Sequence, residues 1–360
     1  MTPRPLAVRC GAFGDMVLLT ALIRVLHARF GVPVDILTSG PWSEPLLRGQ
    51  PGIGDVWSLR SRKAPYWLST GQRRAVRALS ARAPGPTWYC DGNDAARKLL
   101  DRAAIPETLI VDVRDHPLRP GEHATEQWRR LAQLTPSALE TPPAANAPRA
   151  VPPLTDAQLA EVAPGCCLEV GDPQRRDLAA WLRARGLSAA PLILLQIGNK
   201  RTMRRGFKRL AVNNKYWPLE RWAEVIRHVR ERCPRHELVL LGTDPEFELN
   251  ESVTRLAGAS RVHNAADDLP IPRLVALLER ARGLITVDSG PAHAAAAVGC
   301  PLVALFGKAS PTLYRPRGTA GADVKVICGE LDGEPDMLGI EARSVIEAFS
   351  TLKLRGAEVP

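Results

Sequence analysis

The second half of the chain alternates short apolar runs with segments of helical periodicity. We expect strands at 192–196, 238–241, 283–287 and 301–306, and helices at 219–232, 271–281 and 291–298. In the helix expected at 219–232, apolar residues recur every three or four positions, and Pro218 stands near the first turn. Strands that alternate with helices predict a parallel sheet whose two faces are covered by helices.

The first half opens with a similar pattern. An apolar run at 5–10, a glycine loop, a helical pattern at 16–30 and a second apolar run at 32–37 follow one another, which predicts a β-α-β unit. The β-branched run at 108–113 predicts another strand. Residues 135–165 are crowded with Pro and Ala and show little periodicity, which indicates irregular structure or the approach to a linker.

The chain has 360 residues, which exceeds the usual size of one domain, so two domains are expected. We expect one Rossmann-like domain at 1–180, a second at 181–345, and a C-terminal helix and tail at 346–360. The longest uncharged stretch, 289–307, is interrupted by glycine and proline. We therefore interpret it as a helix followed by a strand rather than as a membrane span.

Composition narrows the class of protein. Hydrophobic residues make up 45% of the chain, which excludes a disordered or collagen-like protein. Lys and Arg total 48 against 38 acids, a net charge of +10, which favours an anionic partner: nucleic acid, a phosphorylated substrate or a membrane surface. Seven cysteines without a C-x-x-C pair lead us to expect reduced thiols. The first apolar run, 16–23, is short and lies between Asp15 and Arg24, so we expect no signal peptide and a cytoplasmic protein.

The sharpest local signal is the segment 286–293, where an apolar strand ends and a helix of small residues begins. Asp288 stands at the carboxyl end of the strand, where α/β proteins bind ligands. Ser289 and Gly290 allow a pyrophosphate to approach the backbone N–H groups and the positive end of the helix dipole. The alternative is an ordinary capped helix with His293 in the core.

Asp15 and Lys215 are candidate catalytic residues. Asp15 lies where the first strand meets the first helix, so its carboxylate can cap that helix or act as a general base. Lys215 precedes the helix that begins near Pro218, so its ammonium can hold a substrate phosphate or remain a solvated loop group.

Two tracts are rich in basic residues and contain no acid. One, between Asp55 and Asp91, contains Arg60, Arg62, Lys63, Arg73, Arg74, Arg77 and Arg82. Trp57 and Trp67 lie among them, and the second tract spans 200–215. Basic residues interleaved with aromatic ones can bind nucleic acid or anionic lipid, or they can form an ordinary solvated surface.

Three motifs, in this order, resemble the heptosyltransferase-like enzymes of glycosyltransferase family 9. The family's G-D is met by Gly14 and Asp15, its K-x-W-P by Lys215, Trp217 and Pro218, and its D-S/T-G-x-x-H by Asp288, Ser289, Gly290 and His293. The resemblance covers roughly residues 5–350. It implies the α/β fold class GT-B, in which two Rossmann-like domains with parallel sheets face an interdomain cleft.

The resemblance also implies a reaction. It is an inverting, metal-independent and cofactor-free transfer of a sugar, typically heptose from ADP-heptose, to a lipopolysaccharide-core or related glycan acceptor. Asp15 would deprotonate the acceptor hydroxyl and Lys215 would stabilise the diphosphate leaving group. The donor nucleotide would be held by Asp288, Ser289, Gly290, Pro291, Ala292 and His293, with Glu246 as a candidate for the ribose. Charge that develops on a leaving diphosphate requires cationic or N–H stabilisation.

On the acceptor side we expect contacts from Arg60, Arg62 and Lys63 to a phosphorylated, lipid-linked or glycan acceptor. We expect a monomer that binds no nucleic acid and associates peripherally with the cytoplasmic face of the inner membrane through its basic tract. Two alternatives remain. A sugar-nucleotide 2-epimerase shares the fold, although there Gln-Glu replaces Pro-Ala-His after the D-S-G, and a basic nucleic-acid-binding protein would leave Asp15 without a role.

Overall fold

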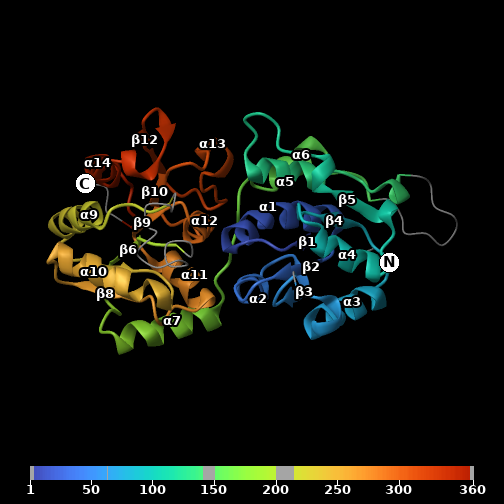
Figure 1. Cartoon of the computed structure of the whole chain (residues 1–360), viewed down its shortest axis with the longest axis horizontal. Helices are drawn as coiled ribbons and strands as arrows, with labels where there is room; N and C mark the ends of the chain where they lie inside the picture. The colour runs from blue at the N-terminus through green and yellow to red at the C-terminus, as the bar shows by residue number, and fades with distance from the viewer. Residues whose placement is uncertain (1–3, 63, 141–150, 200–214, 357–360) are drawn as a thin grey trace. The chain divides into compact units, whose positions relative to one another are not determined.

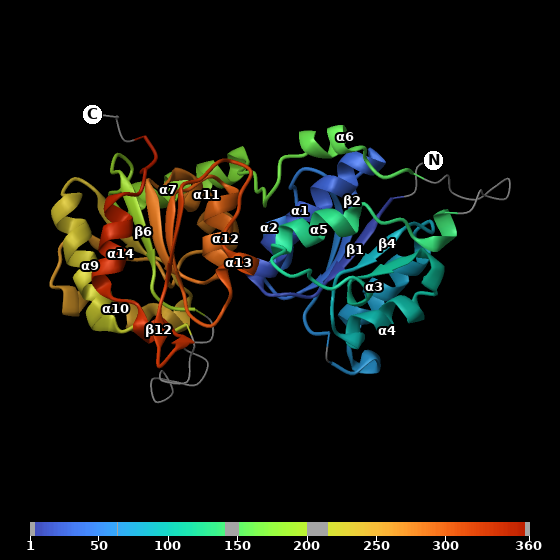
Figure 2. The same cartoon turned by 90° about the horizontal axis from the view of Figure 1, so that it is seen from above.

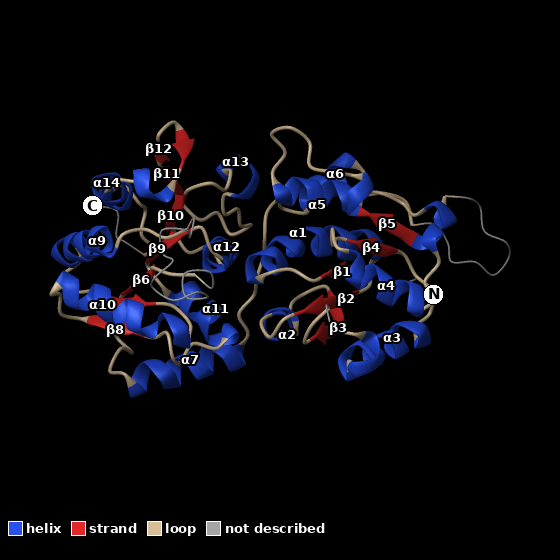
Figure 3. Cartoon of the chain, viewed as in Figure 1, coloured by secondary structure: helices blue, strands red, loops and turns tan. Residues whose placement is uncertain are grey.

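The chain forms two compact units, Met1–Glu169 and Val170–Pro360, in a computed structural model that describes residues 4–62, 64–140, 151–199 and 215–356 (Figure 1). A sheet of parallel strands lies at the centre of each unit, with helices on both faces (Figure 3). The predicted α/β class with two Rossmann-like domains is confirmed.

The first unit contains five parallel strands in the order β3-β2-β1-β4-β5. These strands are β1 (Leu6–Arg9), β2 (Val34–Ser39), β3 (Ile53–Leu59), β4 (Thr87–Tyr89) and β5 (Ile110–Asp112). The helices are α1 (Phe13–Phe30), α2 (Ser43–Leu47), α3 (Thr70–Ala81), α4 (Asp94–Arg102), α5 (Ala124–Ala132) and α6 (Asp156–Glu161). Short 3-10 turns are η1 (Tyr66–Leu68), η2 (Glu107–Leu109), η3 (Val113–Asp115) and η4 (Ser137–Leu139).

Two helix pairs cover the first sheet. Apolar residues of α3 and α4 form one core cluster with Leu6 and Val8 of β1, and α1 packs against α5. Helix α1 ends at Gly31, whose φ of 65° suits glycine because a side chain is disfavoured there. The strand expected at 108–113 is shorter than predicted, because 3-10 turns occupy both of its ends.

Arg29, in α1, binds two stretches of the chain, 132–135 and 151–152. Its buried guanidinium donates hydrogen bonds to the carbonyls of Ala132, Leu134, Val151 and Pro152 and to the Thr135 hydroxyl, at 2.6–3.1 Å. Burial lowers the pKa of Arg29 to about 10. One charged donor thus holds both of these stretches against α1.

The second unit contains six parallel strands in the order β11-β10-β9-β6-β7-β8. These strands are β6 (Leu192–Gln196), β7 (Glu237–Leu240), β8 (Val262–Asn264), β9 (Gly283–Val287), β10 (Leu302–Phe306) and β11 (Val324–Cys328), and β12 (Glu330–Leu331) and β13 (Glu334–Pro335) form a small hairpin. The helices are α7 (Asp172–Ala184), α9 (Leu219–Arg232), α10 (Phe247–Ala257), α11 (Ile271–Arg280), α12 (Gly290–Ala297), α13 (Pro311–Tyr314) and α14 (Ala342–Ser350). Short 3-10 turns are η6 (Asp244–Glu246) and η7 (Met337–Gly339).

Helices α9, α10 and α14 cover one face of the second sheet, and α7, α11 and α12 cover the other (Figure 2). Counted from the first strand of the unit, the strand order 3-2-1-4-5-6 is that of a Rossmann fold. The stretch 289–307 is a helix followed by a strand, as predicted. None of the described helices is long and apolar enough to cross a membrane.

Both expected domain limits differ from the structure. The boundary falls between Glu169 and Val170 rather than at 180, because α7 packs against α11 and therefore belongs to the second unit. The C-terminal helix is not a separate segment, because α14 packs against α9, β10 and β11. Tertiary packing assigns both helices to the second unit.

Candidate active site

Lys215 and Asp288, which stand 73 positions apart in the sequence, are in direct contact. The Lys215 ammonium lies 2.6 Å from Asp288 Oδ2 and donates a second hydrogen bond, 2.9 Å long, to the Asp288 carbonyl. Only 24% of the lysine side chain and 10% of the aspartate side chain are exposed. The two residues, to which the sequence assigned separate roles, therefore form one ion pair.

The fold places this pair at the switch point of the second sheet. Asp288 directly follows β9, whose five residues are all buried, and β6 and β9 are the neighbouring strands at which the strand order reverses. Ligands of open α/β sheets bind outside the carboxyl ends of the strands at such a point. The pair thus occupies the position where this fold binds substrates.

Trp217 holds Lys215 in place. Its indole is fully buried, donates a hydrogen bond of 2.9 Å to the Ile340 carbonyl and packs edge-on against Trp222, with ring centroids 5.0 Å apart. Pro218 is the N-cap of α9. Trp217 is therefore the buried anchor of the K-x-W-P segment, whose lysine lies at the sheet edge.

The first turn of α12 contains the remaining residues of the motif. Ser289 is the N-cap, but its side chain makes no capping hydrogen bond, and its hydroxyl lies 3.0 Å from the Thr286 hydroxyl. Pro291 and Ala292 follow in the first turn, and His293 is buried. Backbone N–H groups at a helix start favour an anion.

Glu246 lies near the carboxyl end of β7, the strand next to β6. Its carboxylate accepts hydrogen bonds from the Thr243 N–H at 2.9 Å, the Thr243 hydroxyl at 2.8 Å and the Gln196 side chain at 3.2 Å. A Cβ at Gly198 would lie 2.6 Å from Glu246 Oε1, so a larger residue there would displace this carboxylate. Burial raises the pKa of Glu246 above its ordinary value.

In the first unit, Asp15 lies in the first turn of α1, just beyond β1 at the switch point of that sheet. Its Oδ2 accepts a 2.7 Å hydrogen bond from the Ala12 N–H, and its Oδ1 lies 2.9 Å from Arg9 Nη2. The carboxylate thus makes the capping contact that was one of its two predicted roles. With 36% of its side chain exposed, it is also accessible to a substrate.

Arg9 is a site residue that sequence reasoning missed. Besides contacting Asp15, its guanidinium donates a 2.7 Å hydrogen bond to the Cys90 carbonyl and stacks over the Trp128 ring at 5.6 Å. An arginine inside an otherwise apolar strand was the available signal, since a strand buried on both faces rarely contains a charge without a partner. Arg9 orients the Asp15 carboxylate.

The candidate acceptor residues differ in their surroundings. Arg62 lies at the carboxyl ends of β1 and β4, where its Nη1 is 2.5 Å from Asp91 Oδ2 and donates a 2.8 Å hydrogen bond to the Cys10 carbonyl. Arg60 is exposed just after β3, and Lys63 lies outside the described residues. Arg62 is therefore at the same sheet edge as Asp15, where an internal ion pair holds it.

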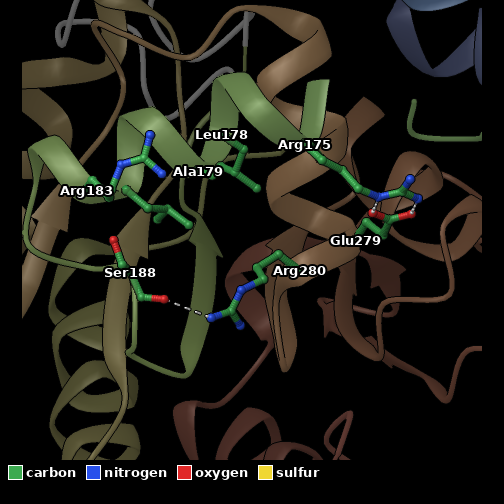
Figure 4. A pocket seen from close by; sticks show the side chains of 9 residues that line it. Arg175, Leu178, Ala179, Arg183, Ser188, Glu279 and Arg280 are labelled. Atoms are coloured by element: carbon green, nitrogen blue, oxygen red, sulfur yellow. Dashed lines mark hydrogen bonds and ion pairs between the residues drawn. The ribbon is translucent and has the colours of Figure 1, made fainter. Parts of the chain in front are cut away.

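A groove of about 560 Å³ between α7 and α11 contains none of the predicted site residues (Figure 4). Arg175 and Glu279 pair across it at 2.9 Å, and Arg280 donates a hydrogen bond to the Ser188 carbonyl at 3.3 Å. Arg280 and Ser188 stand shortly before β9 and β6, towards the amino ends of these strands. The groove is thus separate from the pair at the carboxyl edge.

Within the described residues, no three or more His, Cys, Asp or Glu side chains are placed to hold a metal ion.

Two Rossmann-like units, each with polar groups at the carboxyl edge of its sheet, agree with the predicted GT-B fold class, and the likeness to solved structures confirms it. A glycosyltransferase family 9 structure from Veillonella parvula matches with a TM-score of 0.74 and 19% identity over 97% of this chain and 96% of that chain. Escherichia coli ADP-heptose lipopolysaccharide heptosyltransferase II matches with a TM-score of 0.66 and 20% identity over 96% and 97%. At these identities the likeness establishes the fold.

The sequence comparisons show which family part of the chain resembles. Residues 207–336 match the model of glycosyltransferase family 9 (heptosyltransferase), a segment that contains Lys215, Glu246 and the motif from Asp288 to His293. Lipopolysaccharide heptosyltransferase 2 of Escherichia coli K12 is 27% identical over 118 residues, 32% of this chain and 33% of that protein. Lipooligosaccharide heptosyltransferase 2 of Haemophilus influenzae is 36% identical over 84 residues, 23% and 22% respectively.

The matches thus span about a third of the length of these relatives, or less. They confirm the predicted resemblance to glycosyltransferase family 9 and agree with the predicted enzyme class. Asp15, Arg60 and Arg62 precede the segment that the family model matches, so their roles stay predictions.

Proposed function

We propose that this protein is an inverting glycosyltransferase that moves heptose from ADP-heptose to a lipopolysaccharide-core or related glycan acceptor. The observation that carries the proposal is the contact between Lys215 and Asp288 at the sheet switch point, inside the segment that matches the family. The relatives are named as lipopolysaccharide heptosyltransferases, and an Escherichia coli heptosyltransferase that shares the fold was solved with ADP and with a fluorinated ADP-heptose.

The donor side supplies positive charge where the reaction needs it. As the bond between the anomeric carbon and the diphosphate oxygen breaks, negative charge develops on ADP. The Lys215 ammonium and the backbone N–H groups that begin α12 stabilise that charge. The Glu246 carboxylate, held by Thr243, accepts hydrogen bonds from the ribose hydroxyls.

The acceptor side supplies the base. The acceptor hydroxyl oxygen attacks the anomeric carbon from the face opposite the diphosphate, which inverts the configuration, and its proton passes to Asp15. Arg9 and the Ala12 N–H orient the Asp15 carboxylate before the reaction begins. Arg60 and Arg62 contact the phosphates of the acceptor. The proposal includes no metal, no cofactor and a single copy of the chain.

The test is transfer from ADP-heptose to a deacylated lipopolysaccharide-core acceptor, measured in EDTA with the product anomer read by NMR. Asp15→Asn keeps an oxygen that can cap α1 but removes the base, so we expect turnover to fall about 10²–10⁴-fold. The affinity for ADP should remain unchanged. Asp94→Asn, an exposed carboxylate in the first turn of α4, is the matched control and should retain activity.

Three outcomes would overturn parts of this proposal. Near-wild-type turnover of Asp15→Asn would show that Asp15 is not the base. Activity that requires an added divalent cation would refute the metal-free mechanism. Conversion of a UDP-sugar to its 2-epimer without any acceptor would replace the transferase by the epimerase alternative.

A further inference from the structure

We propose that the first unit binds the surface of an anionic phospholipid bilayer through one patch, the α3 patch. It consists of Trp67, Leu68, Arg73, Arg74 and Arg77. The patch combines two protruding apolar side chains with three cations, and this inference goes beyond the proposed transfer reaction because it concerns where the enzyme is held.

The apolar part of the patch is unusually exposed. Trp67 is 74% exposed and Leu68 is 61% exposed, and both lie in the short turn η1. Trp57, which lies in the same basic tract, is partly buried and packs against the core of the unit, so it is not part of the patch. Adjacent large apolar side chains exposed to water indicate an interaction surface.

The cationic part follows from the helical spacing of α3. Gln72, Ala75, Val76 and Leu79 face the core, which leaves Arg73, Arg74 and Arg77 together on the opposite, exposed face. Within the described part of the chain, none of these three arginines forms an ion pair. With Thr70 they line a hollow of about 200 Å³, where lipid phosphates can meet several guanidinium groups.

The turn is tied to the helix. The Gln72 side chain donates hydrogen bonds to the carbonyls of Ser61 and Ala64, at 3.0 and 2.9 Å, and Arg73 donates one to the Trp67 carbonyl. Tyr66, the first residue of the turn, packs on the core and lies under the Arg102 guanidinium, 4.6 Å from the ring centre. The apolar and cationic groups therefore form one pre-organised surface.

An anionic bilayer fits this combination. Tryptophan prefers the region between lipid headgroups and acyl chains, and arginines are attracted to the negative surface. Stable membrane binding generally needs two signals, and the patch supplies both. The turn η1 follows β3 at the carboxyl edge of the sheet, which is also the edge of Asp15. Binding there would bring a lipid-linked acceptor towards the candidate base at the cytoplasmic face of a membrane.

The experiment is co-sedimentation of the full chain with vesicles of phosphatidylcholine alone or mixed with phosphatidylglycerol. We expect binding to the anionic vesicles only, reversed by salt. Each basic residue near such a surface contributes roughly fivefold, so Arg73→Gln/Arg74→Gln/Arg77→Gln should lower the partition coefficient about a hundredfold. The matched control, Arg176→Gln/Arg183→Gln/Arg235→Gln, removes three exposed charges from the second unit and should bind almost as the wild type does.

A second measurement reports on the tryptophan. Among the tryptophans, Trp67 alone is exposed, so brominated lipids in the vesicles should quench the wild-type fluorescence but not that of Trp67→Phe. Transfer to a soluble acceptor should persist in all these variants, which separates this inference from the proposed function. Wild-type protein that ignores anionic vesicles, equal losses in the two triple variants, or equal quenching in Trp67→Phe would overturn the proposal.

Discussion

The contact between Lys215 and Asp288 predicts that the two residues act as a unit in catalysis. Lys215→Met removes the ammonium but keeps the length of the side chain, and loss of one preorganised group that stabilises developing charge lowers turnover by about 10²–10³. Asp288→Ala removes the oxygen 2.6 Å from the ammonium but leaves the carbonyl contact at 2.9 Å, so the lysine should lose only part of its positioning. We expect about a tenfold loss.

The double variant measures the coupling. If the aspartate works by holding the lysine, Asp288→Ala should cost less than about threefold in the Lys215→Met background, a coupling free energy of about 0.7–1.4 kcal/mol. Both side chains are at least three-quarters shielded from solvent. We therefore expect a coupling free energy larger than that of a solvent-exposed salt bridge. Asp288→Asn keeps an acceptor oxygen and should fall between Asp288→Ala and the wild type.

The assay is steady-state transfer kinetics with ADP affinity measured by isothermal titration for each variant. Lys325→Met, which breaks the 3.8 Å contact with Asp323 in the same unit, is the control for the loss of a lysine and should leave kcat unchanged. Fully additive losses in the double variant would refute the reasoning, because they would mean that Asp288 and Lys215 contribute independently.

Further expectations concern pH and stability. Burial raises the pKa of Glu246, so the folded state binds the carboxyl proton more tightly than the unfolded state does. The contribution of Glu246 to the free energy of unfolding therefore falls as the pH rises from the ordinary pKa of a glutamate towards the raised pKa. Thermal melts over this pH range should show the decline in the wild type but not in Glu246→Gln. The same pH dependence in both proteins would contradict this expectation. Arg29→Met should lower the free energy of unfolding by about 3–5 kcal/mol, because five oxygen acceptors lose a buried donor; a urea titration showing less than about 1 kcal/mol would count against this anchor. Trp217→Leu should cost about 2–4 kcal/mol and also reduce kcat through Lys215, which differential calorimetry and kinetics can test together.

The second unit was the more predictable half. Strands β6 and β9 and helix α9 have the expected bounds, because strands buried on both faces read as continuous apolar runs and α9 buries a single stripe. In the first unit, fewer of the strands could be predicted from the sequence. Strand β3 is mostly half-buried and β4 has three residues, so neither produced a pattern that separates a strand from a loop.

The sequence also contained the candidate site residues, but not their partnerships. Motif spacing identified Asp15, Lys215 and Asp288 one by one. The contact of Lys215 with Asp288, and of Arg9 with Asp15, arises from chain topology and from the packing of Trp217, which local periodicity does not encode.

The local sequence determined which segments become helices and strands and which motifs end at the sheet edges, because hydrophobic periodicity and backbone propensity act over a few residues. Only the tertiary structure decided that α7 and α14 belong to the second unit and that Trp67 rather than Trp57 faces solvent. These outcomes depend on contacts between distant segments, and such contacts exist only once the sheet has brought those segments together.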